Sequence, residues 1–308
     1  MNACSRHSAR NSASLLAACL CLSVCAEAAN NHHRVVQGML LEVDPAARSI
    51  TVSCEAIPGY MDAMVMPFEV RDARSLKALR PGLDIRFTMV AQGSKEYAEH
   101  LQIVDTANHE SEPTQAGQLA VLDRALDPAS AAKAIPIGKP VPDFTLTDQL
   151  HQTTSLSQLK GKVVAITFAY SRCPNPNYCF RLSNNLFQLS RRFKGDAGRD
   201  LALITIVIDP ANDQGKGLEQ YAETWKADPA IWRFLTGPVE TIRGIAQSFG
   251  MNFWSDEGFL IHSFHTVVID RQGRLAANLD GNQFSAKQLG DLVQTVLEPK
   301  PRISASLK

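Results

Sequence analysis

An apolar run that leads into two closely spaced cysteines constrains the fold of this chain more than any other feature. Residues 163–168 read Val-Val-Ala-Ile-Thr-Phe, which is typical of a strand buried on both faces of an α/β sheet. Residues 180–189 then carry apolar side chains at helical spacing. Cys173 and Cys179 therefore lie in a turn between a buried strand and a helix. Because N–H groups at a helix N-terminus favour negative charge, we expect a lowered thiol pKa in this turn.

The chain beyond this turn continues to alternate between strand and helix patterns. The expected strands are 201–209 and 232–236 and a hairpin of 266–270 with 275–279; the expected helices are 217–227, 239–249 and 285–297. A dithiol after the first core strand of such a series is typical of the thioredoxin-like order. The sequence therefore predicts an α/β thioredoxin-like domain over residues 137–298.

The preceding part of the chain has the pattern of a small all-β domain. Five short strands are expected at 35–43, 49–54, 64–70, 85–90 and 97–104. Five strands in about 70 residues favour a small OB-like barrel, which we place at residues 34–105. Residues 106–136 have little pattern apart from one helical piece at 119–126, and we interpret them as a linker. The predicted protein is thus multi-domain, with a barrel followed by a thioredoxin-like domain.

The first residues resemble an export signal. Basic residues precede an apolar core at 14–26, which is too short to span a membrane, and Ala26-Glu27-Ala28 fits a cleavage site. We therefore expect residues 1–28 to be a signal peptide and the protein to be periplasmic. Leu16–Cys19 also fits a lipoprotein box, which leaves lipid anchoring as the alternative. The formal net charge of zero gives no reason to expect nucleic-acid binding.

Four sulfur side chains fall within thirteen residues of the expected barrel. They are Cys54, Met61, Met64 and Met66, in a chain that has only seven methionines. Thiolate and thioether sulfur are soft ligands that select Cu(I). The alternative is that these side chains only fill the barrel core, since methionine packs well into irregular gaps.

The segment Gly59–Phe68 resembles the signature of CusF-like periplasmic copper-binding domains. Such domains are small OB barrels with a Met-x-Met pair, a histidine ligand on the preceding strand and an aromatic residue that covers the metal. Cys54 stands where that histidine would fall, and Met61 lies near the aromatic position with Tyr60 beside it. The resemblance implies a Cu(I) site at Cys54, Met61, Met64 and Met66.

The thioredoxin-like part resembles the Sco/SenC family. The resemblance rests on the dithiol and on three later segments, Ile208-Asp209-Pro210, Phe234–Gly237 and Ile261–Gly273. It implies that Cys173 and Cys179 are metal thiolates and that His262 is the third copper ligand. The family usually has three residues between the cysteines and a proline after the second, whereas this chain has five residues and Phe180.

Two further polar residues belong to the same resemblance. We expect His265 to be structural or to hydrogen-bond a ligand. Asp209 either orients the site or caps the second helix of the domain, and the sequence does not separate these alternatives.

Together these features predict an exported copper chaperone that binds copper in both domains, Cu(I) in the barrel and Cu(I) or Cu(II) in the thioredoxin-like domain. Its partners would be a copper-accepting membrane oxidase or copper resistance protein, and a thiol reductant protein that keeps the dithiol reduced. The alternative is an enzyme, a thiol–disulfide oxidoreductase in which Cys173 and Cys179 are catalytic and reduce the cysteines of a metalloprotein. We expect a monomer in either case.

Overall fold

The computed structural model describes residues 33–104, 134–174, 176–196, 198–256 and 259–298. The expected signal peptide at 1–28, the helical piece at 119–126 and most of the expected linker lie outside the described residues. Within the described ranges, no helix has both the length and the apolar character needed to cross a bilayer.

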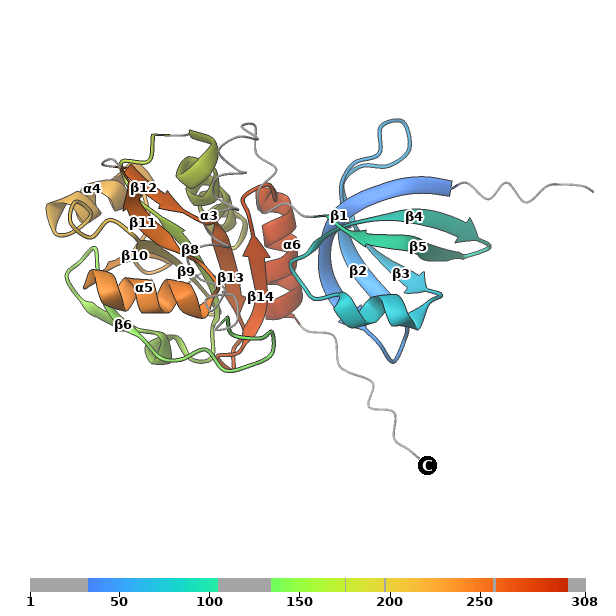
Figure 1. Ribbon diagram of the computed structural model, residues 1–308, viewed down its shortest axis with the longest axis horizontal. Helices are drawn as coiled ribbons and strands as arrows, with labels where there is room; N and C mark the ends of the chain where they lie inside the picture. The colour runs from blue at the N-terminus through green and yellow to red at the C-terminus, as the bar shows by residue number, and fades with distance from the viewer. Residues whose placement is uncertain (1–32, 105–133, 175, 197, 257–258, 299–308) are drawn as a thin grey trace, which may run out of the picture. The chain divides into compact units, whose positions relative to one another are not determined.

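The N-terminal part is the predicted small all-β structure (Figure 1). Its strands are β1 (His33–Asp44), β2 (Ser49–Cys54), β3 (Val65–Val70), β4 (Asp84–Gln92) and β5 (Lys95–Ile103), with a short 3-10 helix, η1 (Ala73–Ala78), after β3. They pair in the order β1-β2-β3-β5-β4, and β4 also pairs with β1, so the ladder returns to its first strand. This arrangement confirms the predicted barrel and its five strands.

The barrel core follows from the period-two pattern of its strands. Alternate residues of β2, namely Ile50, Val52 and Cys54, are all buried. Phe68 of β3 meets Phe87 of β4 edge-on, with ring centroids 4.8 Å apart. The methionine segment is held against β2, because Val52 pairs with Met66 and the N–H of Cys54 donates to the carbonyl of Met64 at 2.9 Å.

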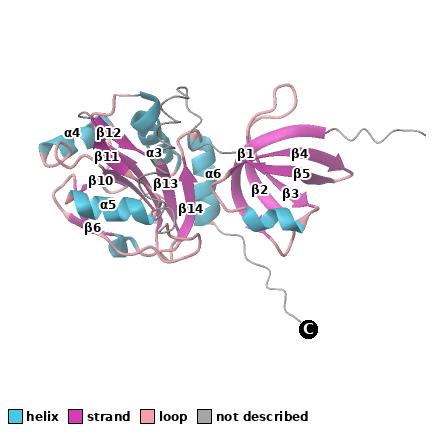
Figure 2. Ribbon diagram, in the orientation of Figure 1, coloured by secondary structure: helices cyan, strands magenta, loops and turns pink. Residues whose placement is uncertain are grey.

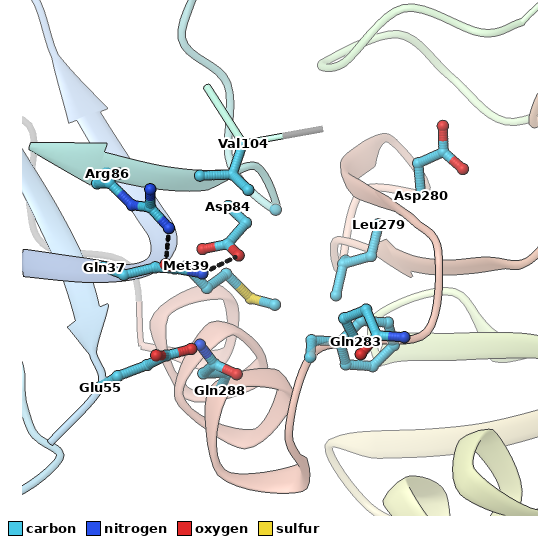
Figure 3. A pocket seen from close by; sticks show the side chains of 12 residues that line it. Gln37, Met39, Glu55, Asp84, Arg86, Val104, Leu279, Asp280, Gln283 and Gln288 are labelled. Atoms are coloured by element: carbon cyan, nitrogen blue, oxygen red, sulfur yellow. Dashed lines mark hydrogen bonds between the residues drawn. The ribbon is translucent and has the colours of Figure 1, made fainter. Parts of the chain in front are cut away.

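Polar side chains connect β1 and β4 on the outside of this core (Figure 3). Gln37 donates to Asp84 at 3.1 Å and accepts from Arg86 at 2.9 Å. Burial raises the pKa of Asp84 to about 6, because desolvation outweighs the hydrogen bond from Gln37.

The C-terminal part contains a seven-stranded mixed sheet in the order β14-β13-β8-β9-β10-β6-β7. Its strands are β6 (Thr145–Asp148), β7 (Thr153–Ser155), β8 (Val163–Ala169), β9 (Leu201–Val207), β10 (Trp232–Thr236), β13 (His265–Ile269) and β14 (Leu275–Asp280). The central strands β8, β9 and β10 run parallel, and the outer pairs are antiparallel. Every residue of β8 and β9 is buried, as the continuous apolar runs predict.

Helices cover both faces of this sheet (Figure 2). They are α3 (Arg181–Arg192), α4 (Lys216–Thr224), α5 (Val239–Ser248) and α6 (Ala286–Leu297), with a short 3-10 helix, η2 (Leu156–Leu159), before β8. Apolar residues of α3, α4 and α6 form one core cluster with Val163 and Ala165 of β8. Those of α5 form a second cluster with Val164, Ile166 and Phe168 of the same strand. The two clusters therefore fill the two faces of the sheet, as in a thioredoxin-like α/β fold.

Two local features were not predicted from the sequence. A separate hairpin is formed by β11 (Phe253–Asp256) and β12 (Phe259–His262), in a segment where we expected no strand. A single turn of π-helix, η3 (Pro176–Phe180), precedes α3. Both features lie beside the dithiol, and π-helical turns occur frequently at functional sites.

Candidate metal centre

The loop after β8 brings the two cysteines together in spite of the five residues between them. Both are free thiols, and their sulfur atoms lie within hydrogen-bonding reach of one another. Cys179 lies in η3 and is 2% exposed, whereas Cys173 remains partly exposed. The π-helical turn accommodates the longer insert and directs the Cys179 side chain into the core. The dithiol therefore has one buried sulfur and one sulfur that solvent can reach.

The last residue of β12, His262, completes the group. Its side chain is buried, and the Nε2 atom lies 3.7 Å from the Sγ atom of Cys179. Its Nδ1 atom lies 2.9 Å from the carbonyl oxygen of Ser263, which can only accept a hydrogen bond. We therefore assign the proton of the neutral ring to Nδ1, which leaves the Nε2 lone pair facing the sulfur.

Burial and the contact between the two thiols set the protonation of these groups in the metal-free protein. It lowers the pKa of His262 to about 4, so the imidazole is neutral at physiological pH and able to bind a metal. The hydrogen bond with Cys173 and burial both raise the pKa of Cys179, while backbone N–H groups act in the opposite direction. The expected lowering of the thiol pKa by the helix N-terminus is therefore wrong for Cys179, because the neighbouring thiol and desolvation outweigh the helix.

The arrangement consists of two close pairs that share Cys179. Cys173 and His262 each lie beside that residue. Within the described part of the chain, no three His, Cys, Asp or Glu side chains are gathered closely enough to hold a metal ion. Coordination of one copper ion by all three residues would thus require a small adjustment of the partly exposed Cys173 or of the hairpin that ends at His262.

Two carboxylates anchor the residues directly before Cys173. Asp213 accepts hydrogen bonds from both the N–H and the hydroxyl of Ser171. Asp209 accepts from Arg172 at 2.8 Å and from the amide of Asn212 at 3.0 Å. Helix α4 begins seven residues after Asp209 and has no side-chain cap, so the capping alternative for Asp209 is wrong, and the orienting alternative stays a prediction. Asp213 was not predicted from the sequence, in which its position four residues after Asp209 was the available signal.

The second histidine of this region, His265, is bonded to side chains that do not belong to the dithiol group. Its Nδ1 atom lies 2.9 Å from the side-chain oxygen of Asn278, and its Nε2 atom lies 3.7 Å from Asp280. Both partners belong to β14. His265 therefore has the structural surroundings that we expected for it.

Tyr170 is a site residue that the sequence analysis missed. Its ring meets that of His262 edge-on, with centroids 5.8 Å apart. Its hydroxyl donates to the carbonyl of Leu260 at 3.2 Å and also hydrogen-bonds Cys173. Burial and the nearby thiols of Cys173 and Cys179 raise the pKa of Tyr170, so the hydroxyl keeps its proton. In the sequence, Tyr170 resembles the end of the apolar strand, and only its spacing of three residues from Cys173 indicated a role.

In the barrel, the four candidate sulfur side chains range from buried to exposed. Cys54 is 1% exposed and directs its Sγ atom toward the carbonyl of Val52 at 3.7 Å. Met61 and Met66 are partly buried and pack against the cluster that contains Cys54, while Met64 is 46% exposed. Burial, assisted by the carboxylate of Glu96, raises the pKa of Cys54 to about 12. The metal-free barrel therefore holds a protonated thiol beneath a methionine layer that reaches the surface.

Tyr60 has a partner other than a metal. The guanidinium of Arg34 lies over its ring at 3.7 Å from the centroid, in cation–π geometry. One face of this exposed ring is thus occupied by Arg34. Met61 forms an isolated β-bridge with Ile57, and its side chain packs against the barrel core. The geometry favours Met61 over Tyr60 as the residue that covers the sulfur group.

Comparison with known proteins agrees with both parts of the chain. The family model SCO1/SenC matches residues 134–298, and the model described as copper binding periplasmic protein CusF matches residues 34–103. The SCO1 protein homolog of Bacillus subtilis (strain 168) is 29% identical over 138 residues, which are 45% of this chain. This match spans 63% of that relative, less than two thirds of its length.

Solved structures of Sco proteins are similar to the C-terminal part. Arabidopsis thaliana ScoI with copper bound is 21% identical with a TM-score of 0.44, over 51% of this chain and 97% of that one. BsSco, described as a member of the Sco family of cytochrome c oxidase assembly proteins, is 24% identical with a TM-score of 0.46, over 53% and 96%. Copper is named in the description of the CusF model and in that of the Arabidopsis structure. Because the SCO1/SenC match covers more than half of the 308 residues, the protein belongs to the SCO1/SenC family.

Proposed function

We propose that this protein is an exported copper chaperone with one copper site in each of its two parts. The observation that carries the proposal is the position of Cys179 between the sulfur of Cys173 and the neutral Nε2 atom of His262. Two thiolates and one imidazole form a mixed soft and borderline ligand set, which suits Cu(I) and also accepts Cu(II). The exposed sulfur of Cys173 would be the point at which copper passes to an acceptor by ligand exchange.

The barrel would hold Cu(I) through Cys54, Met64 and Met66, with Met61 covering the metal. The exposure of the sulfur side chains falls from Met64 at the surface to buried Cys54. This supports the proposal, because soft ligands are then present from the surface to the core. Binding at Cys54 requires loss of the thiol proton, since only the thiolate is a strong metal ligand. The competing proposal, that Cys54 is only a core residue, is supported by its burial.

The alternative function is that of a thiol–disulfide oxidoreductase. It is favoured by the hydrogen-bonding reach between the two sulfurs, since a partly exposed thiol beside a buried one is suited to attack and resolution. Copper binding and disulfide formation would exclude each other, because both use the same sulfur atoms. Reduction of a protein disulfide by the chain at a useful rate would favour this alternative.

Location and partners are proposed from the signal-like N-terminus and the family. We place the protein in the periplasm, free or lipid-anchored. We expect its acceptor to be a membrane oxidase or a copper resistance protein, with a thiol reductant protein that restores the dithiol.

Titration of the reduced full chain with Cu(I), in competition with a Cu(I) chelator, tests the proposal. We expect two copper ions per chain, and one in Cys173→Ser. His262→Ala should weaken the same site, whereas His265→Ala, the matched control, should retain two ions. Unchanged stoichiometry and affinity in Cys173→Ser would contradict the assignment of the second site.

A further inference from the structure

A groove lies beside the dithiol, and the proposed copper site does not use it. The groove has a volume of about 600 Å³ and is lined by the loop after β9, the start of α5 and the β11–β12 hairpin. One of its lining residues, Arg172, directly precedes Cys173 in the chain. Another, Leu260, packs against the same core cluster as Cys173. The groove therefore lies next to the partly exposed sulfur.

The walls of the groove are largely apolar. Val239, Phe253, Trp254 and Leu260 all line it, and the Val239 side chain is exposed although it is apolar. A concave apolar surface of this size, with a few polar groups, is typical of a site that binds a ligand or a short segment of a partner.

The charged groups of the groove are positive overall. Its charged lining residues are Arg172, Arg243 and Asp209. The Asp209 carboxylate is buried and already accepts from Arg172 at 2.8 Å and from Asn212 at 3.0 Å. Arg243 pairs at 3.4 Å with Glu240, an exposed residue outside the lining, and such surface pairs contribute little. An occupant with apolar side chains and a carboxylate would therefore suit this groove.

The barrel carries a segment of that chemistry. Residues 55–64, which we call the methionine loop, join β2 to β3. Tyr60 and Met64 of this loop are exposed. The charged residues of the loop are two exposed carboxylates, Glu55 and Asp62. The loop thus presents apolar and acidic side chains together, and it ends at a proposed Cu(I) ligand.

We propose that the groove receives the methionine loop of a second copy of this chain, so that Cu(I) passes from Met64 of one copy to Cys173 of the other. The proposal rests on the proposed function, because it takes both parts of the chain as copper sites. The loop of a second copy can approach the groove without constraint from the chain that joins the two parts.

Charge and packing both favour this occupant. The acidic loop complements the positive groove, and the one guanidinium that lies on the loop, that of Arg34, is stacked on the Tyr60 ring. Methionine sulfur also makes favourable contacts with aromatic rings, such as that of Trp254 in the groove. A contact of this small size would be transient, in keeping with a protein that is otherwise a monomer.

The transfer is an exchange of ligands, and copper remains Cu(I) throughout. The ion leaves the thiolate and thioethers of the barrel and binds the two sulfurs and the imidazole of the second site. Cys54 takes up one proton as it loses the metal, and the two thiols of the dithiol give up one each. One proton is therefore released to solvent for each ion transferred.

The test mixes two full-length chains. The donor has Cys173→Ser and Cys179→Ser and carries one Cu(I) in its barrel. The acceptor is reduced and has a barrel disabled by Cys54→Ala, Met64→Leu and Met66→Leu. The chains are separated by an affinity tag at fixed times, and the copper in each is counted. We expect a rate proportional to the concentrations of both chains, which falls at high salt and persists when a chelator captures any copper released to solution.

Val239→Glu in the acceptor should slow the transfer about tenfold, because it places a negative charge in the groove. Leu150→Glu is the matched control, since it puts the same charge on an exposed apolar residue outside the groove, and it should leave the rate unchanged. In the donor, Asp62→Lys should slow transfer to an unaltered groove and should restore part of the rate to the Val239→Glu acceptor. Recovery in this charge swap measures a direct coupling between the two positions. The Cu(I) affinity of the acceptor should be the same with and without Val239→Glu.

Equal rates to the Val239→Glu and Leu150→Glu acceptors would overturn the proposal, as would a rate that depends on the donor alone with the copper captured by the chelator. If Val239→Glu does not fold, an Asp62→Lys donor that transfers as fast as the unaltered donor would overturn it. Transfer within single wild-type chains, with none between chains, would assign the groove to the loop of the same chain and remove the second copy as its occupant. A failure of the proposed function is distinct from all of these results, because the donor or the acceptor would then bind no copper when tested alone.

Discussion

At the scale of single residues, burial decides the chemistry of both candidate sites. Burial keeps His262 neutral and Cys54 protonated in the metal-free protein. A neutral imidazole is ready to bind copper, but a buried thiol must first release its proton. The two sites should therefore respond differently to pH.

The lowered pKa of His262 predicts a loss of stability in acid. The imidazole titrates near 6.5 when unfolded and near 4 when folded, so only the unfolded chain takes up a proton between these values. Above about pH 6.5 there is no penalty. Between pH 6.5 and 4 the free energy of unfolding should fall, by up to about 3 kcal/mol at about 1.4 kcal/mol per pKa unit. His262→Gln should remove this part of the acid dependence.

Denaturant unfolding of the reduced, metal-free chain at pH 7 and pH 4.5 measures the effect. All three tryptophans, Trp225, Trp232 and Trp254, lie in the thioredoxin-like part, so their fluorescence reports on that part alone. Subtracting the acid loss of unfolding free energy in His262→Gln from that in wild type removes the contribution of the other titrating groups, which both chains share. An acid loss that is the same in both chains would contradict the buried neutral histidine.

The raised pKa of Cys54 predicts that Cu(I) binding in the barrel depends on pH. Each ion bound to the Cys54 thiolate displaces one proton at any pH below about 12. The apparent affinity should therefore rise about tenfold per pH unit between pH 6 and 9. Competition titrations in a Cys173→Ser, Cys179→Ser background isolate the barrel. Cys54→Ala should bind more weakly and lose the slope, and Cys54→His should recover affinity with little slope above pH 7.

A Cys54→Ala barrel with wild-type affinity and slope would show that the methionines bind the metal without Cys54. That result would leave Cys54 as a core residue, beside Ile50 and Val52 on the inner face of β2.

At the scale of elements, the site depends on loops that follow or precede the central strands. Asp209 and Asp213, from the loop between β9 and α4, hold Arg172 and Ser171 directly before Cys173. The side chain of Asp213 is buried, and burial raises its pKa. The two hydrogen bonds that it accepts from Ser171 offset part of the cost of burying the carboxylate. Loss of this anchor should release the cysteine loop.

Asp213→Ala should lower Cu(I) affinity at the Cys173 site about tenfold and cost about 1–3 kcal/mol of stability, because two hydrogen bonds of about 0.5–1.5 kcal/mol each are lost. The control is Asp196→Ala, which removes an exposed ion pair with Arg199. Such pairs contribute little to stability. Chelator competition and denaturant unfolding measure both quantities, and equal behaviour of the two variants would contradict the anchoring role.

The sequence predicted the regular elements well and the site loops less well. The period-two pattern of β2 and the apolar runs of β8 and β9 indicate which residues of these strands are buried. Both folds could therefore be predicted from the sequence. The β11–β12 hairpin was missed because the residues between its strands, Glu257-Gly258, are not among the usual two-residue hairpin signals such as Asn-Gly and Asp-Gly. The π-helical turn at Cys179 and the hydrogen bonding of the Tyr170 hydroxyl depend on contacts between segments that are distant in the sequence. No local sequence pattern predicts such contacts.

At the scale of the whole molecule, one chain combines two different sets of soft ligands. The barrel would use three thioethers and one thiolate, and the thioredoxin-like part a dithiol and an imidazole. Among the described cysteines, Cys173 and Cys179 lie together whereas Cys54 lies apart and is buried, so disulfide formation within the described part of the chain would switch the second set and not the first.

Oxidation should therefore remove one copper site and leave the other. We expect the chain with a Cys173–Cys179 disulfide to bind one Cu(I), in the barrel, and the reduced chain to bind two. Copper analysis after gel filtration, with thiol counting by mass spectrometry, measures this. Two ions retained on the fully oxidised chain would contradict the shared use of the sulfurs.

The proposed copper site is tested most directly by the coordination of copper in the thioredoxin-like part. A chain whose barrel is disabled by Cys54→Ala, Met64→Leu and Met66→Leu is loaded with one Cu(I) and studied by X-ray absorption. We expect two sulfur ligands and one nitrogen ligand, with the nitrogen lost in His262→Ala and one sulfur lost in Cys173→Ser. A spectrum without a nitrogen ligand, or one that neither substitution changes, would contradict the proposed site.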